Sequence, residues 1–333
     1  MRILERLDEL YAIGDRIGYS PEEQLAHDLA AGWFREAGLE VEVDEGGNLI
    51  GRVPGGRREV WTGSHLDTVP SGGRFDGALG VVAGLEVVER LGLPGLGVVV
   101  FRDEERGCAG SRARVAAREL PDAFLELHIE QGPRLLDAGV PLAAVTAIVG
   151  YSRQTVTIAG RAGHAGTTPM SGRDDALCAA AERLLAIREA ALAIPETVAT
   201  VGTLTVQPGG VNVIPGSVSF TVDVRAPDRE RLDKLLGAIG LETGVGTEPA
   251  VMDAQVVSAV RGALEELGVP VVELPSGAGH DAGILAAAGV PSGMLFVRSL
   301  NGGVSHSPDE LTSEEDVALA VDALTSALRS LAS

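Results

Sequence analysis

The sequence has few positively charged residues for its length. Its 333 residues include 27 Lys and Arg against 47 Asp and Glu, which gives a formal net charge of −20. Proteins that bind nucleic acid or anionic membranes need clustered Lys and Arg, so this balance disfavours both kinds of partner. We expect a small-molecule ligand instead.

Cysteine and long apolar runs are also scarce. Cys108 and Cys178 are the two cysteines, too few for a disulfide framework. No apolar run approaches the ~20 residues that cross a bilayer. The first residues, MRILERLDELYAIG, form a charged amphipathic stretch rather than a secretory signal peptide. We expect a cytoplasmic protein without a membrane span.

The sequence does contain clear hydrophobic periodicity, and the order of predicted helices and strands changes twice along the chain. The capping pattern Ser20-Pro21-Glu22-Glu23 opens a helix, and α/β alternation follows to about residue 148. Between 149 and 252 the order of strands and helices is typical of an antiparallel sheet with two helices on one face, and the α/β style then returns. The expected helices lie near 78–91, 174–193 and 228–239, between 252 and 271, after 280 and from 313. The expected strands lie at 39–43, 48–53, 60–62, 98–101, 153–158, 197–206, 217–225, 271–273 and 294–297.

A chain of this length exceeds the usual size of one hydrophobic core. The prediction is therefore an α/β catalytic domain with a mixed, mostly parallel sheet between helices, formed by 1–148 and 253–333. An α+β domain over 149–252 is inserted into it.

Histidine is rare as well, with six in the chain. His27 falls on the polar side of the first helix, and the other five stand at strand ends or in Gly-rich loops. A lone loop histidine is more often structural than a ligand, but His65 is followed by Asp67 and Asp76, and Glu104-Glu105 ends the next buried strand. The carboxyl ends of parallel strands form the usual ligand crevice, where these groups should converge.

This mixture of side chains suits a metal site. Imidazole and carboxylate hold cations such as Zn²⁺ or Mn²⁺, and one carboxylate can bridge a pair ~3.5–4 Å apart, a task that suits Asp76. Asp67 is placed to accept a hydrogen bond from the non-ligating nitrogen of His65. One of the two glutamates can bind metal while the other stays free as a base. Without the neighbouring histidines and aspartates, the glutamate pair would be interpreted as two solvated acids at an exposed strand end.

Five motif groups in order resemble the hydantoinase/carbamoylase amidases. That family includes N-carbamoyl-L-amino-acid hydrolase, allantoate amidohydrolase and dinuclear β-ureidopropionase. The pair HIEQGP and GHAGTTPM is highly specific, and the resemblance covers nearly the whole chain. The matching segments are 63–77 (GSHLDTVP through GGRFDG), 103–105 (DEE), 127–133 (LHIEQGP), 163–170 (GHAGTTPM), and 276–282 (SGAGHDA) joined to 305–308 (SHSP).

The resemblance implies two divalent metal ions, of which Zn, Mn, Co and Ni are the candidates. Glu104 matches the general base that takes a proton from the bridging water, and we count Asp67 with it among the catalytic residues. His128 stands where related peptidases and aminoacylases have a carboxylate. The implied ligand sets are His65, Asp76 and His128 for one ion and Asp76, Glu105 and His306 for the other.

The inserted domain resembles the family's lid and dimerisation module, which implies a homodimer. Within it, His164 matches a residue, expected from the partner subunit, that polarises the scissile carbonyl. Arg225 matches a clamp on the substrate carboxylate, although it could also be a surface cation. Asn212, otherwise a turn residue, and Gln131 match groups that hold the ureido or carboxylate end. His280, preceded by Gly279, either lines the pocket or caps a helix. The substrate-binding candidates are thus Arg225, Asn212, Gln131, His280 and Gly279.

The implied reaction is hydrolysis of a non-peptide C–N bond in an N-carbamoyl-L-amino acid. Allantoate stays open as a rival substrate, because it too carries a carboxylate beside ureido groups. A peptidase or aminoacylase fits less well with His128 and Gln131, and a catalytically silent scaffold would have little need of Glu104. The chain departs from the family in a short segment from Ser111 to Asp122 and in Arg106 after the glutamate pair, where Gly is expected. The family also has a cis peptide after the bridging aspartate, so we expect the Asp76-Gly77 bond to be cis.

Overall fold

The computed structural model describes residues 2–333, which divide into two compact units. One unit comprises residues 2–148 and Ala250–Ser333, and the other comprises Val149–Pro249. Each unit has its own hydrophobic core. Within residues 2–333, no helix has the length and apolar character needed to cross a membrane.

The first unit is built on a mixed sheet of nine strands, counted within residues 2–333. Its strands are β1 (Glu40–Val43), β2 (Leu49–Arg52), β3 (Val60–His65), β4 (Leu96–Phe101), β5 (Ala123–Ile129), β6 (Leu142–Ile148), β12 (Ala250–Val251), β13 (Glu273–Ser276) and β14 (Ser292–Val297). They follow the order β1-β2-β4-β3-β5-β14-β6-β12, and β13 also pairs with β6. The central strands β4, β3, β5 and β14 run parallel, whereas β1–β2, β2–β4 and β6–β14 are antiparallel.

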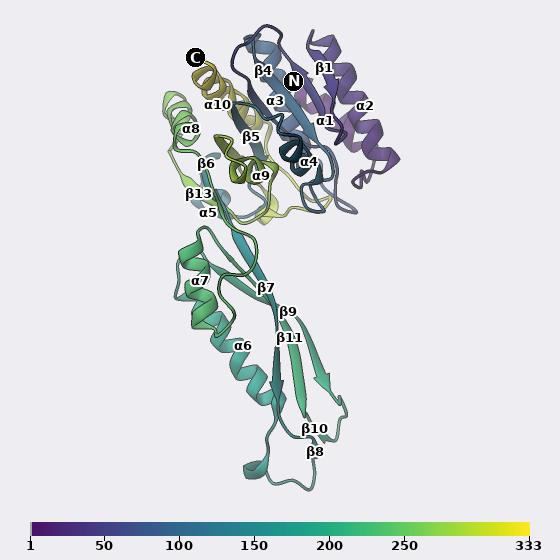
Figure 1. Ribbon diagram of the computed structural model, residues 1–333, viewed down its shortest axis with the longest axis vertical. Helices are drawn as coiled ribbons and strands as arrows, with labels where there is room; N and C mark the ends of the chain where they lie inside the picture. Colours follow the sequence, from purple (N-terminus) through teal and green to yellow (C-terminus); the bar gives the residue numbers. More distant parts are fainter. Residues whose placement is uncertain (1) are drawn as a thin grey trace. The chain divides into compact units, whose positions relative to one another are not determined.

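Helices lie on either side of this sheet (Figure 1). They are α1 (Arg2–Tyr11), α2 (Pro21–Glu36), α3 (Ala78–Leu91), α4 (Ala109–Ala117), α5 (Arg134–Ala138), α8 (Ala254–Glu266), α9 (Asp281–Ala287) and α10 (Glu314–Ala332), with a short 3-10 turn at Asn301–Gly303. Helix α3 packs on α1 and α10, α10 packs on α8, and α4 packs on α9. The predicted fold class is confirmed.

The central strands are buried along their whole length. Every residue of β3, β4, β5 and β14 is inaccessible to solvent or nearly so. A strand that is covered on both faces has a continuous apolar sequence instead of an alternating one, and Val98-Val99-Val100-Phe101 is an example. Polar side chains near the ends of such strands therefore stand out. His65 is the last residue of β3, and His128 is the last but one of β5.

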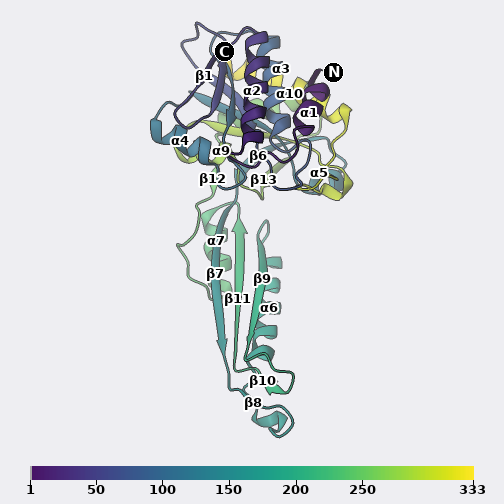
Figure 2. The same ribbon diagram turned by 90° about the vertical axis from the view of Figure 1, so that its right-hand side faces the viewer.

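The second unit has an antiparallel sheet covered by two helices. Its elements are β7 (Gly150–Ala159), β8 (Gly163–His164), α6 (Ala176–Leu192), β9 (Val198–Gln207), β10 (Val213–Ile214), β11 (Ser217–Ala226) and α7 (Arg229–Ala238), with a 3-10 turn at Met170–Gly172. Strand β11 lies between β7 and β9, and β8 pairs with β10. Alternate residues of β11, from Val218 to Ala226, are buried beneath α6 and α7 (Figure 2).

Three local expectations are wrong. His27 is buried, because Glu23 on the same helix accepts hydrogen bonds from Arg102 and from the backbone of Asp103, so this side of α2 packs against the end of β4. The strand expected at 271–273 lies at Glu273–Ser276, since its pairing with β6 begins only at the carbonyl of Val272.

The third wrong expectation concerns the peptide bond after Asp76, which was predicted to be cis. Among the described residues, the one cis bond precedes Pro208, so Asp76-Gly77 is trans. Gly77 turns the chain into α3 with a φ of +64°, a conformation that glycine adopts without strain.

Candidate active site

The register of two parallel strands brings His65 and His128 together. Val60 pairs with Ala123 and Thr62 with Leu125, so the two histidines occupy equivalent positions, each five residues after the start of its strand. Their rings are stacked, with centroids 5.9 Å apart and planes inclined by 27°. Residues far apart in the sequence thus meet at one edge of the sheet.

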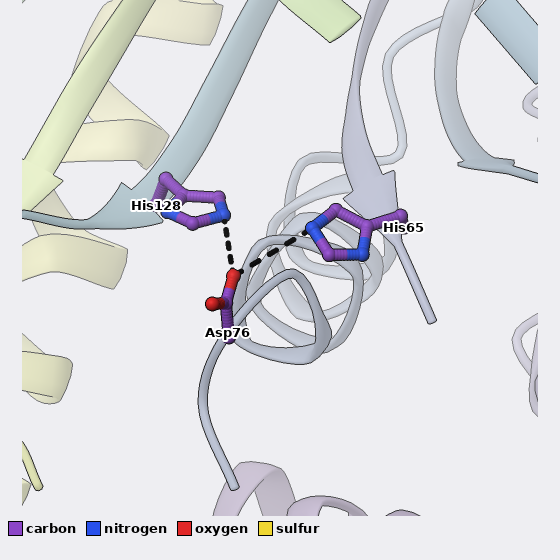
Figure 3. A group of neighbouring side chains, drawn as sticks. All are labelled: His65, Asp76 and His128. Carbon is purple, nitrogen blue, oxygen red and sulfur yellow. Dashed lines mark ion pairs between the residues drawn. The ribbon is translucent and has the colours of Figure 1, made fainter. Parts of the chain in front are cut away.

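Asp76, in the loop before α3, points between these rings (Figure 3). Its Oδ1 lies 3.1 Å from Nε2 of His128 and 3.7 Å from Nε2 of His65. Its other oxygen, Oδ2, lies 3.4 Å from Nε2 of His306. One carboxylate therefore faces two groups of ligands with different oxygens, as a bridging ligand would.

The second group consists of Asp76, Glu105 and His306. Nε2 of His306 is 3.3 Å from Oε2 of Glu105. The potential ligand atoms in this group lie within 4.8 Å of one another, and the same holds for His65, Asp76 and His128. Asp76 is buried, whereas the His306 side chain is half exposed. The second group is thus the more open of the two.

Backbone carbonyls orient the two buried imidazoles. Nδ1 of His65 lies 3.1 Å from the carbonyl of Asp67, and Nδ1 of His128 lies 2.9 Å from the carbonyl of Ile129. A carbonyl can only accept, so each Nδ1 carries its proton and each Nε2 edge faces Asp76. This is the arrangement found around metal-bound histidines, and nitrogen and carboxylate donors suit borderline divalent cations. The residues therefore fit a metal site.

The carboxylate of Asp67 accepts hydrogen bonds from the backbone of the glutamate pair. Its Oδ1 accepts the backbone N–H of Glu104 at 3.0 Å, and its Oδ2 accepts that of Glu105 at 3.1 Å. The same Oδ1 lies 3.3 Å from Nδ1 of His65. Asp67 thus connects the end of β3 to the loop after β4.

Glu104 is buried beside the first group, with Oε2 3.8 Å from Nε2 of His65. Burial raises the pKa of Glu104 well above its usual range, and the charges of Asp281, Glu105 and Asp76 act in the same direction, although His65 opposes them. A carboxylate with a raised pKa is a stronger base, which is the property that proton abstraction requires.

The histidines hold protons when no cation is bound. Hydrogen bonds to Asp76 and Glu105 raise the pKa of His306 to about 10. Burial disfavours charge on His65, but Glu104, Asp67 and Asp76 together raise its pKa well above the usual value. Protons on Nε2 of these rings occupy the positions that a cation would take, so a cation must displace them.

Metal binding is accordingly expected to release protons and to strengthen as the pH rises from 7 towards 10. His306 is protonated below about pH 10 in the metal-free protein, so apparent affinity should rise by about tenfold per pH unit for each proton displaced. Calorimetric titration of Mn²⁺ into metal-free protein, in buffers of different ionisation enthalpy, counts the protons. Heats that do not depend on the buffer would contradict this protonation state.

The structure places the other predicted residues of this unit at different distances from the ligand groups. Nε2 of Gln131 donates to Oδ2 of Asp76 at 2.8 Å and is 3.5 Å from Nε2 of His306. His280 is buried behind His128, with ring centroids 4.5 Å apart, and its Nε2 is 2.8 Å from Oγ of Ser276. It stands at the N-cap of α9 without making a side-chain cap bond. Gly279, beside it, is exposed.

An open pocket of about 430 Å³ adjoins the second ligand group. Gln131 and His306 form part of its wall, and Gly277 and Ala278 contribute to it from the loop that precedes Gly279. The rest of the wall is mixed, because Leu274, Pro275 and Phe296 are apolar whereas Glu130 and Arg134 are charged. A small organic molecule can therefore lie next to His306 with an apolar portion against this wall.

The predicted residues of the second unit fall into two places. His164 on β8 pairs with Val213 on β10, and the carbonyl of Asn212 accepts the N–H of Ala165. Both side chains are exposed at the tip of this ribbon. Arg225 pairs with Tyr151 near the other end of β11, and its Nε donates to Asp223. The strand length between Ser217 and Arg225 alone is roughly 26 Å, so His164 and Arg225 of one chain cannot contact the same small molecule.

Glu126 and Glu310 are buried acids close to this site that the sequence motifs do not single out. Glu126 accepts hydrogen bonds from Oγ of Ser64 and from the backbone of Ala282. It also forms a third group of potential ligand atoms with His128 and His280, but its oxygens are already used to join β3, β5 and α9. Glu310 contacts the Asp76 loop. An acid inside an apolar strand, as in Leu125-Glu126-Leu127, was the signal for the first, and the acid shortly after Ser305-His306-Ser307-Pro308 was the signal for the second.

Comparison with known proteins agrees with this site. Residues 61–330 match the model of peptidase family M20/M25/M40, and the chain belongs to that family. Within it, the resemblance to the hydantoinase/carbamoylase amidases is confirmed. The crystal structure of a hydantoinase/carbamoylase family amidase from Burkholderia multivorans superposes with a TM-score of 0.90 at 32% identity, covering 98% of this chain and 96% of that one.

Relatives of known sequence point to the same branch. An N-carbamoyl-L-amino acid amidohydrolase from Geobacillus stearothermophilus is 39% identical over 395 aligned positions, covering 97% of this chain and 96% of the relative. An allantoate amidohydrolase from Bacillus subtilis is 35% identical over 361 positions, covering 89% and 87%. The first alignment is longer than the 333 residues of this chain, so the relative has segments without a counterpart here.

Proposed function

We propose that this amidohydrolase uses two divalent cations to hydrolyse the ureido C–N bond of an N-carbamoyl-L-amino acid. The observation that carries the proposal is the position of Asp76, whose two oxygens face two separate groups of ligands. Glu104, a buried carboxylate with a raised pKa, stands beside the first group. A scaffold without catalytic function would not need this combination.

The residues that would hold the cations are those of the two groups. His65 and His128 complete the first with Asp76, and Glu105 and His306 complete the second. A pair of such ions lowers the pKa of water and stabilises negative charge on a carbonyl oxygen. Zn²⁺, Mn²⁺, Co²⁺ and Ni²⁺ all suit these ligands.

Glu104 serves as the general base and then as the general acid. It takes a proton from the attacking water as the oxygen adds to the carbamoyl carbon, and it returns the proton to the leaving nitrogen. Cleavage of one ureido C–N bond releases one nitrogen product and leaves a carbamate, which loses carbon dioxide and releases the second nitrogen. The overall products of an N-carbamoyl-L-amino acid are therefore the amino acid, carbon dioxide and ammonia. Asp67 fixes the backbone of Glu104 and so the reach of its side chain.

The second unit, Val149–Pro249, is proposed as a lid and dimerisation module. His164 would steady the developing oxyanion, Asn212 would hold the ureido end, and Arg225 would grip the substrate carboxylate. The separation of His164 and Arg225 along one chain supports a homodimer, because one of the two must then come from a second copy. A cytoplasmic location is consistent with the free thiols of Cys108 and Cys178.

A His164→Ala variant is expected to keep its metal and to lose about 10²–10³-fold in kcat, the usual effect of removing one oxyanion donor. His164 is exposed and far in sequence from the metal ligands, so metal content should not change. Steady-state kinetics together with metal analysis test this. Full activity in the variant would remove His164 from the mechanism.

The pocket wall supports an amino-acid derivative as substrate. It is lined by the apolar residues Leu274, Pro275 and Phe296 and by the charged residues Glu130 and Arg134. An N-carbamoyl-L-amino acid has both a hydrocarbon side chain and a charged end, whereas allantoate lacks the hydrocarbon side chain. Gln131, Gly277 and Ala278 add polar and backbone groups to the same pocket.

Ammonia release from N-carbamoyl-L-amino acids and from allantoate, measured side by side, tests the substrate assignment. We expect the larger kcat/KM for an N-carbamoyl-L-amino acid with an apolar side chain. Preference for allantoate would place the chain in the rival branch. Metal binding without release of ammonia from either compound would favour another amide substrate or the silent scaffold.

A further inference from the structure

We propose that Glu310 is a positioning residue that fixes the loop carrying Asp76 against the loop carrying His306, and so preforms the bridge between the two ligand groups. The inference rests on the proposed metal site and adds a residue to it. Glu310 belongs to neither ligand group. Its role would be to place the groups that do bind.

The first contact of Glu310 is with the backbone N–H groups of two successive residues, Phe75 and Asp76. Oε1 of Glu310 accepts the N–H of Phe75 at 2.7 Å and that of Asp76 at 2.9 Å. Glu310 is only 5% exposed, so water does not compete freely for these bonds. One oxygen therefore fixes the orientation of the segment from which the Asp76 side chain projects.

The second contact reaches the other loop. Oε2 of Glu310 accepts from Oγ of Ser305 at 2.8 Å, and the same Oγ lies 3.1 Å from Oδ2 of Asp76. Ser305 directly precedes His306, whose Nε2 faces that same oxygen of Asp76. Glu310 thus links the backbone of Asp76, its side chain through Ser305, and the loop of His306.

The glycine at position 73 allows this approach. A Cβ atom at Gly73 would lie 2.3 Å from Cδ of Glu310 and 2.6 Å from its Cβ. The second distance involves the rigid base of the side chain, so rotation of the carboxylate alone could not relieve the clash. The loop before Asp76 is therefore shaped around Glu310.

Burying a second acid beside Asp76 is unfavourable by itself. Burial and the charge of Asp76 raise the pKa of Glu310. A buried carboxylate is tolerated when hydrogen bonds replace its hydration, and here three donors do so. The position thus favours an acceptor of defined geometry, and its negative charge is not the essential property.

The test compares Glu310→Ala, Glu310→Gln and Gly73→Ala with the control Asp309→Ala. Asp309 is the neighbouring acid, and it is exposed. Two properties are measured: the affinity for Mn²⁺ in competition with a chelator, and amide hydrogen exchange of the peptide covering 72–77 in the metal-free protein. The second readout needs no metal, so it separates failure of this inference from failure of the proposed metal site.

Glu310→Ala is expected to bind Mn²⁺ 10–100-fold more weakly, the usual cost of losing a residue that orients metal ligands. Exchange should accelerate at 72–77 and stay unchanged in β3 and β5, whereas general destabilisation would accelerate exchange throughout the unit. Gly73→Ala should act in the same direction. Glu310→Gln should stay close to the wild type, because its amide oxygen can accept both N–H groups and its NH₂ can donate to Ser305. Wild-type affinity and wild-type exchange in Glu310→Ala would overturn the inference.

Discussion

Asp76→Ala is expected to abolish measurable ammonia release and the binding of both cations. Asp76 is the single residue shared by the two ligand groups, with Oδ1 facing His65 and His128 and Oδ2 facing His306. Removing any other ligand leaves one group complete, whereas removing Asp76 disrupts both. Metal analysis after gel filtration, together with activity, measures the effect.

The control for this variant is the thermal response to metal. A cation that binds the native state raises the melting temperature of the wild type, and added Mn²⁺ should not raise that of Asp76→Ala. Asp309→Ala, an exposed acid, should respond like the wild type. One tightly bound ion per subunit in Asp76→Ala would show that the two groups do not depend on a shared bridge.

Glu104→Gln is expected to lower kcat by about 10²–10⁴-fold, the range typical of a lost general acid–base, while both cations remain bound. The amide has the same shape as the carboxylate, and the backbone bond to Asp67 is unaffected. A glutamine at this position cannot accept the proton from water. The Michaelis constant should change little, since the step lost is chemical.

Glu105→Gln is the matched comparison, because the two adjacent glutamates are assigned opposite tasks. Oε2 of Glu105 lies 3.3 Å from Nε2 of His306, so its loss should weaken one cation of the pair. The expected outcome is reduced metal content in Glu105→Gln and full metal content in Glu104→Gln. Equal metal loss in both variants would contradict the division of roles.

The features predicted well from the sequence are those carried by local patterns. Buried strands such as Val98-Val99-Val100-Phe101 are read from an uninterrupted apolar run, and the capping pattern at Ser20 places the start of α2, where Oγ of Ser20 accepts the N–H of Glu23. The ligand candidates also stand in short motifs near strand ends. Parallel register then brings His65 and His128 together.

What could not be predicted depends on partners distant in sequence. Glu310 acts on Phe75 and Asp76 across more than 230 residues, and no periodicity records such a bond. His27 was predicted to lie on a polar, exposed face of its helix. The helix sequence does not reveal that Arg102, which follows β4, covers this face and donates to Glu23. Gln131, whose role in holding substrate stays a prediction, donates to Asp76, a residue 55 positions away in the sequence, and no local pattern predicts that contact.

Reconstitution of the metal-free enzyme tests the proposed two-metal mechanism most directly. Protein stripped by a chelator is assayed for ammonia release from an N-carbamoyl-L-amino acid before and after addition of Mn²⁺, Co²⁺, Ni²⁺ or Zn²⁺, with bound metal counted in each sample. We expect no activity in the stripped enzyme and restored activity as bound metal approaches two ions per subunit. Full activity in protein shown to be free of metal would contradict this mechanism.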